Sequence, residues 1–208
     1  MNDALWYVGR GTGAASLLLL STVVTLGIAT RSGRVVFGLP RFAVAAVHRS
    51  ASLTALVFLL IHVTSLYLDP YAQLHLVDLI VPFAGAYRPF WLGLGTVGLD
   101  LIAALVVTSL LRQRIGLRTW RAVHWLAYLS WPVALSHALG NGTDNGTWWL
   151  RTLAAACTVA VLGAAAWRVS ERFQEYGQAR VPLRHHQGAP ALPADRGVDF
   201  TATGDRVP

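Results

Sequence analysis

Four of the seven histidines lie inside long apolar runs, where an ionisable side chain is costly and usually has a function. His48 and His62 share one run, and His124 and His137 share another. The separations are 62 − 48 = 14 and 137 − 124 = 13 residues, which is about 20 Å along a helix axis. Each run therefore offers one imidazole near each face of a membrane.

Five apolar runs are long enough to cross about 30 Å of hydrocarbon as helices. They lie near residues 12–30, 42–68, 89–111, 119–139 and 147–169. Only 13% of the 208 residues are charged, against about 25% in soluble domains. The predicted fold class is therefore all-α, an integral membrane bundle of five transmembrane helices. The first run lacks a small-x-small cleavage site, so we expect a retained span rather than a signal peptide.

The arginines predict the orientation of the bundle. The predicted loops 31–41 and 112–121 carry seven arginines, whereas loops 69–88 and 140–146 carry only Arg88. By the positive-inside rule, the N-terminus is outside and the C-terminus is cytoplasmic. Because the basic residues cluster at the ends of spans, the net charge of +7 favours a membrane and no nucleic-acid partner. The absence of lysine suggests a GC-rich genome, and the expected location is a bacterial plasma membrane.

Both histidine-bearing runs begin at arginine-rich inner loops, so they cross the membrane in the same direction. His48 and His124 then lie at a similar inner depth, and His62 and His137 at a similar outer depth. Two imidazoles at each depth can supply the two axial ligands of a haem iron. Facing helices are where bundles hold such cofactors.

The helical faces fit this arrangement unequally. Fourteen residues at about 100° each leave His48 and His62 on one face of an ideal helix. Thirteen residues leave His137 about 140° away from His124. Pro132 lies between these two and is able to bend the helix.

Other readings of the histidines stay open. They can be structural residues that hydrogen-bond within the bundle of a haem-free protein. A zinc or copper site is less favoured, because each depth offers two imidazoles without a thiolate or a nearby carboxylate. Cys157 is the only cysteine and lies in an apolar run, where we expect a small buried thiol.

These runs resemble the ferric reductase-like transmembrane domain family. It includes the membrane parts of ferric reductases and NADPH oxidases, and the haem-binding membrane subunit of the bacterial periplasmic methionine sulfoxide reductase system. The stronger match runs from Thr108 to His137 (TSLLRQRIGLRTWRAVHWLAYLSWPVALSH), and the second surrounds His48 and His62 (VHRSASLTALVFLLIHV). The resemblance covers roughly residues 5–170 and implies two b-type haems. His48 and His124 would hold the inner haem, and His62 and His137 the outer one.

Haem propionates are anionic and need cationic partners near each membrane face. Arg41, Arg49 and Arg121 are placed for the inner haem. Arg88, with Arg151 as a second candidate, is placed for the outer haem. The alternative reading is that these arginines only anchor the ends of helices at the membrane surface.

The predicted function is a membrane dihaem cytochrome b that carries electrons from a cytoplasmic or quinol donor to an extracytoplasmic acceptor. Residues after 170 carry no Rossmann-type glycine run, so FAD or FMN is expected only through a partner. One alternative is a haem subunit that feeds a separate periplasmic reductase. Another, of a different class, is a haem-free membrane scaffold. Whether this oxidoreductase subunit alone is an enzyme stays open.

The predicted domains are an N-terminal segment (1–11), the haem domain (12–170) and a disordered cytoplasmic tail (171–208) that holds His185 and His186. Segment 71–83 is too short to span and is expected to lie along the outer surface, with His75 as a surface residue. Asp100, near the middle of the third run, is expected to be protonated or hydrogen-bonded, with a proton-relay or quinone role as the alternative.

Overall fold

The computed structural model describes residues 3–32, 38–141 and 146–170, and these residues form helices and no β-strands. The all-α prediction is therefore confirmed. Four helices are long and apolar enough to cross a membrane: α1 (Asp3–Ala29), α2 (Arg41–Leu68), α4 (Pro89–Leu110) and α7 (Trp148–Val169). The first begins nine residues earlier than predicted (12 − 3 = 9), so described residues of the expected N-terminal segment belong to α1. The expected tail lies outside the described residues.

The predicted span 119–139 is divided between two consecutive helices, α5 (Arg112–His124) and α6 (Leu126–Asn141). Residues predicted to form the loop before it are helical as well, apart from Gly116, where φ is 80° and ψ is 158°. Arginine is a good helix former, which explains how this basic segment becomes helical. Trp125, between the two helices, keeps right-handed helical angles (φ −63°, ψ −24°).

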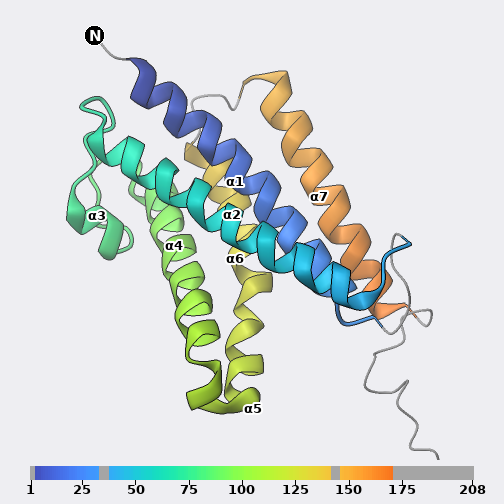
Figure 1. Ribbon diagram of the computed structural model, residues 1–208. Coiled ribbons are helices and arrows are strands. Elements are labelled where there is room, and N and C mark those ends of the chain that lie inside the picture. Colours follow the sequence, from blue (N-terminus) through green and yellow to red (C-terminus); the bar gives the residue numbers. More distant parts are fainter. Residues whose placement is uncertain (1–2, 33–37, 142–145, 171–208) are drawn as a thin grey trace, which may run out of the picture.

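The helices form two antiparallel pairs that are joined through α1 (Figure 1). In one pair α2 packs along α1, and in the other α6 packs along α4. The first helix also contacts α6 and α7. His48 and His62 lie on α2. His124 ends α5 and His137 lies on α6, on the side of the bundle that α4 and α6 form, so a site between the two pairs can draw imidazoles from both sides.

The centre of the bundle is a small apolar cluster where three helices meet. Val24 of α1, Trp131 of α6 and Val161 of α7 are buried against one another. The indole Nε1 of Trp131 donates a hydrogen bond of 2.8 Å to Ser21 Oγ on α1. The Ser21 hydroxyl in turn donates to Leu17 O, so this buried polar contact is satisfied on both sides.

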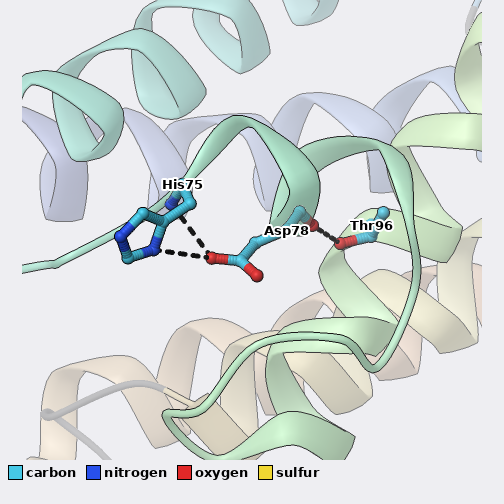
Figure 2. Close-up of polar contacts among 3 residues, drawn as sticks. All are labelled: His75, Asp78 and Thr96. Atoms are coloured by element: carbon cyan, nitrogen blue, oxygen red, sulfur yellow. Dashed lines mark hydrogen bonds and ion pairs between the residues drawn. The ribbon is translucent and has the colours of Figure 1, made fainter.

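The segment between α2 and α4 contains the short helix α3 (Leu76–Ile80), which is held by one buried carboxylate (Figure 2). Asp78 Oδ2 accepts a hydrogen bond of 2.9 Å from the His75 backbone N–H and lies 3.6 Å from the His75 ring nitrogen Nδ1. The Thr96 hydroxyl of α4 donates to Asp78 O at 2.6 Å. The His75 side chain is 78% exposed, which confirms its prediction as a surface residue.

The Ser21–Trp131 contact generates a stability prediction. Replacing Ser21 by alanine leaves a buried indole N–H without its acceptor, and we expect a loss of about 1 kcal/mol in the free energy of unfolding. Thr22→Ala is the matched control, since the Thr22 hydroxyl bonds only to Leu18 O of its own helix. Unfolding in detergent, followed by circular dichroism, measures both. Equal losses in the two variants would show that the link between α1 and α6 contributes nothing specific.

Candidate functional site

A large cavity lies among the histidine-bearing helices and their partners. Its volume is about 1930 Å³, and residues of α1, α2, α4, α5 and α6 line it. This is roughly twice the upper end of the 300–1,000 Å³ that is usual for a single small-molecule pocket. His48, His62, His124 and His137 all line the cavity, so the structure brings the four predicted residues to one space.

The histidines lie in the cavity in the pairs that the sequence suggested. His48 is close enough to His124 for the two rings to interact electrostatically, and the same holds for His62 and His137. The mismatch expected between the helical faces of His124 and His137 does not keep either ring out of the cavity. His124 ends α5 and His137 lies in α6, which contains Pro132, so the two do not share the single ideal helix on which that expectation was based.

Three of the four rings contact the neighbouring helix in the same way. Each ring nitrogen Nδ1 bonds to a backbone carbonyl, and the residue four positions after that carbonyl is a glycine against which the ring lies. We call this a carbonyl–glycine pair. His62 Nδ1 bonds to Gly9 O at 2.7 Å, and its ring lies against Gly13. His48 Nδ1 bonds to Val23 O at 3.1 Å, and its ring lies against Gly27. His137 Nδ1 bonds to Trp91 O at 2.8 Å, and its ring lies against Gly95.

In two of these pairs, at Gly13 and Gly95, the ring occupies the space of a Cβ atom. A Cβ at Gly13 would lie 2.8 Å from His62 Cε1. At Gly95 it would lie 2.6 Å from His137 Cε1, also too close for two carbon atoms. The contact at Gly27 is looser, at 3.3 Å. Since a helical carbonyl is directed toward the residue four positions later, glycine there leaves the oxygen accessible to a ring from another helix.

These hydrogen bonds determine which ring nitrogen can bind a metal. A backbone carbonyl only accepts, so Nδ1 carries the hydrogen and Nε2 keeps a free lone pair. The same arrangement orients metal-ligating histidines in proteins generally and makes the imidazole a stronger donor. His48, His62 and His137 therefore each offer Nε2 as a ligand nitrogen in a ring that lines the cavity.

His124 is held differently from the other three. Its Nδ1 atom is buried and has no hydrogen-bond partner within the described part of the chain. Its ring stacks on Trp120, with ring centroids 4.8 Å apart and an interplanar angle of 26°. Positions four residues apart share a face of a helix, so this contact is local to α5.

The arginines divide into those that line the cavity and those that do not. Arg41, Arg49 and Arg121, the inner candidates, all line it. The outer candidate Arg88 is not among the lining residues, and its Nη1 donates to Gly140 O at 3.0 Å instead. The second outer candidate, Arg151, is not a lining residue either.

Sequence reasoning missed three further arginines that line the cavity, which are Arg10, Arg31 and Arg112. Arg10 follows directly after Gly9, whose carbonyl accepts from His62, so its backbone lies beside the His62 ring. Its guanidinium carbon is 4.0 Å from the centre of the Trp6 ring. A signal for α1 was present in the sequence, because Gly13 and Gly27 have the same separation along the chain as His48 and His62 (27 − 13 = 62 − 48).

The donor set suits an iron porphyrin better than a bare metal ion. The described residues contain no cluster of three or more His, Cys, Asp or Glu side chains that could hold a metal ion. A haem brings four nitrogens of its own and needs only two axial imidazoles. Asp100 is exposed on α4 and is not a lining residue. Cys157 is buried on α7 as a free thiol, as predicted.

The long apolar helices and the cavity between them define a membrane protein of the helical-bundle class. The chain matches the family model described as ferric reductase like transmembrane component over residues 12–135. This is 135 − 12 + 1 = 124 of 208 residues, and it ends two residues before His137. Searches of curated proteins and of solved structures found no match. The chain belongs to the ferric reductase-like transmembrane family.

Family membership sets the broad function. The protein is a multi-pass membrane component of electron transfer, and domains of this family generally bind haem. The cavity fits that group on two structural grounds, the free Nε2 lone pairs and the glycines that admit the rings.

Gly13→Ala tests whether the glycines are needed. The added methyl group collides with the His62 ring, so we expect this variant to bind less haem than the unchanged protein. Gly11→Ala is the matched control two residues away, because a Cβ there meets nothing within 4 Å. Pyridine haemochrome absorbance per chain measures haem content. Equal haem in the two variants would contradict the steric role of Gly13.

Proposed function

We propose that this protein is a b-type cytochrome with two haems that carries electrons across the bilayer, from a cytoplasmic or quinol donor to an extracytoplasmic acceptor. The observation that carries the proposal is the meeting of two imidazole pairs in one cavity, with three of the four rings offering Nε2 as ligand. The two histidine pairs would lie about 20 Å apart along the helices, which suits electron transfer across most of the hydrocarbon layer.

Each level would hold one haem through two axial imidazoles. His48 and His124 form the inner pair, and His62 and His137 form the outer pair. When bound, haem would supply a one-electron couple, and these imidazoles would serve as its ligands from the protein.

The cavity-lining arginines would neutralise the haem propionates. Arg41, Arg49 and Arg121 serve the inner level in this proposal. Arg10 takes the outer role, because it lies beside the carbonyl that holds His62. Arg88, the candidate from the sequence, instead joins the beginning of α4 to α6 through Gly140 O.

The proposal includes a fifth span formed by the end of α5 together with α6. Alone, α6 has 16 residues and reaches only about 24 Å. Helical angles at Trp125 support a run from residue 117 to 141, which is 25 residues and about 37 Å. The arginine-rich inner loops support an outer N-terminus and a cytoplasmic C-terminus. Residues 12–170 would form the haem domain, and a flavin (FAD or FMN) would act only through a partner.

An optical spectrum of the purified protein, with a haem-to-protein ratio, tests this function. We expect a b-type spectrum and two haems per chain. His48→Ala and His124→Ala should each remove the same haem, and His62→Ala and His137→Ala the other. His75→Ala is the control, since this exposed residue lies outside the cavity, and it should keep both haems.

The outcomes also separate the alternatives. A colourless protein would contradict the proposal and favour a haem-free scaffold. A protein that keeps both haems after loss of His48 or His124 would contradict the pairing. A dihaem protein that reduces a tightly bound extracytoplasmic partner but no ferric chelate would be a subunit of a periplasmic reductase.

A further inference from the structure

The inner imidazole pair is built differently from the outer pair. Both outer rings, His62 and His137, donate Nδ1–H to a carbonyl of a neighbouring helix. At the inner level only His48 does so, since the buried Nδ1 of His124 has no partner among residues 3–32, 38–141 and 146–170. The difference is one missing hydrogen bond at one ligand.

The reason lies on α4, the helix that receives the His137 ring. Gly95 lies against that ring near the outer end of α4. On α1, the two glycines that contact histidine rings, Gly13 and Gly27, are 27 − 13 = 14 residues apart. On α4, the residue at the same separation after Gly95 is Ser109 (109 − 95 = 14). Ser109 therefore occupies the position where a second such glycine would be expected. Serine carries the Cβ atom that the receiving glycines lack. The carbonyl four residues before it, of Leu105, also accepts from Thr108 Oγ1 at 3.3 Å.

Ser109 contacts Trp120 instead of a histidine ring. The Trp120 indole donates a hydrogen bond from Nε1 to Ser109 Oγ at 3.4 Å. The same indole stacks on the His124 ring, so Trp120 links Ser109 to His124. Arg112 lies over the same indole, with its guanidinium carbon 5.7 Å from the ring centre. All four residues line the cavity.

We propose that Trp120, anchored by Ser109, is the positioning residue of His124, and that it replaces the carbonyl–glycine pair that holds the other three rings. This inference rests on the proposed function, in which His124 is an axial ligand. Stacking on Trp120 restricts the plane of the His124 ring but forms no hydrogen bond with its N–H group. The inner ligand pair is therefore less electron-donating than the outer pair.

Two effects then raise the midpoint potential of the inner haem above that of the outer haem. A hydrogen bond from Nδ1–H to a carbonyl makes imidazole a stronger donor and stabilises ferric iron, and the inner pair has one such bond fewer. Cationic side chains favour the reduced state, because reduction removes one positive charge. Arg31, Arg112 and Arg121 line the cavity with His124, and Arg121 lies three residues before it in α5.

The test uses potentiometry and electron paramagnetic resonance of the haem-loaded protein. The g values of a ferric haem with two imidazoles depend on the angle between the ring planes, so they report how His124 is held. We expect two reduction steps, with the higher one lost in His124→Ala. Trp120→Leu should shift the g values of the inner haem or release it, while the outer signal stays unchanged.

Three further variants separate a positioning role from a structural one. Trp120→Phe keeps a stacking ring but loses the bond to Ser109, so it should retain the inner haem with a smaller shift. Ser109→Ala removes the same hydrogen bond, so it should retain the inner haem and shift its g values by as much as Trp120→Phe does. Trp148→Leu is the control, because Trp148 is exposed at the beginning of α7 and does not line the cavity.

The outcomes distinguish this inference from the proposed function. A protein without two haems refutes the proposed function. If two haems bind and Trp120→Leu leaves the inner g values and potential unchanged, only the positioning role is overturned. A single reduction step, a lower potential for the inner haem, or an equal shift in Trp148→Leu also overturns the inference.

Discussion

The structure depends on a close contact between an imidazole ring and the backbone of a neighbouring helix. In such a contact the ring nitrogen bonds to a carbonyl that lies in the helix, and the ring fills the space where the next turn would carry a side chain. Only glycine leaves that space open. Because the bond uses Nδ1–H, Nε2 is the nitrogen that remains able to bind a metal. One local arrangement thus determines helix spacing, ring tautomer and ligand chemistry together.

This constraint explains the role of α1, which carries no histidine. Its glycines, Gly13 and Gly27, match His62 and His48 of the antiparallel helix α2 in reverse order. The same helix contacts α6, where the Ser21–Trp131 hydrogen bond holds the two helix pairs together at the centre of the bundle. Through Gly13, Gly27 and the buried Ser21 hydroxyl, α1 therefore supports both levels of the cavity, which a simple membrane anchor would not do.

The sequence predicted the features that depend on apolar length and on the cost of polar groups in lipid. The apolar helices, the gathering of the four histidines and the buried Cys157 all follow from those rules. The helical state of residues 112–115 and the break at Gly116 did not follow, since they depend on local backbone geometry. Arg88 was assigned from its position near a span end alone. Its bond to Gly140 O and the place of Arg10 in the cavity depend on how distant helices pack, which no local pattern contains.

The central claim is that ligands from neighbouring helices meet at two depths in one bundle. Pulsed electron paramagnetic resonance on the fully oxidised protein measures the separation of two ferric haem irons directly. The account predicts two low-spin iron centres about 20 Å apart, which is the rise of a helix from His48 to His62. A single iron centre, or two irons less than about half that helical rise apart, would contradict it.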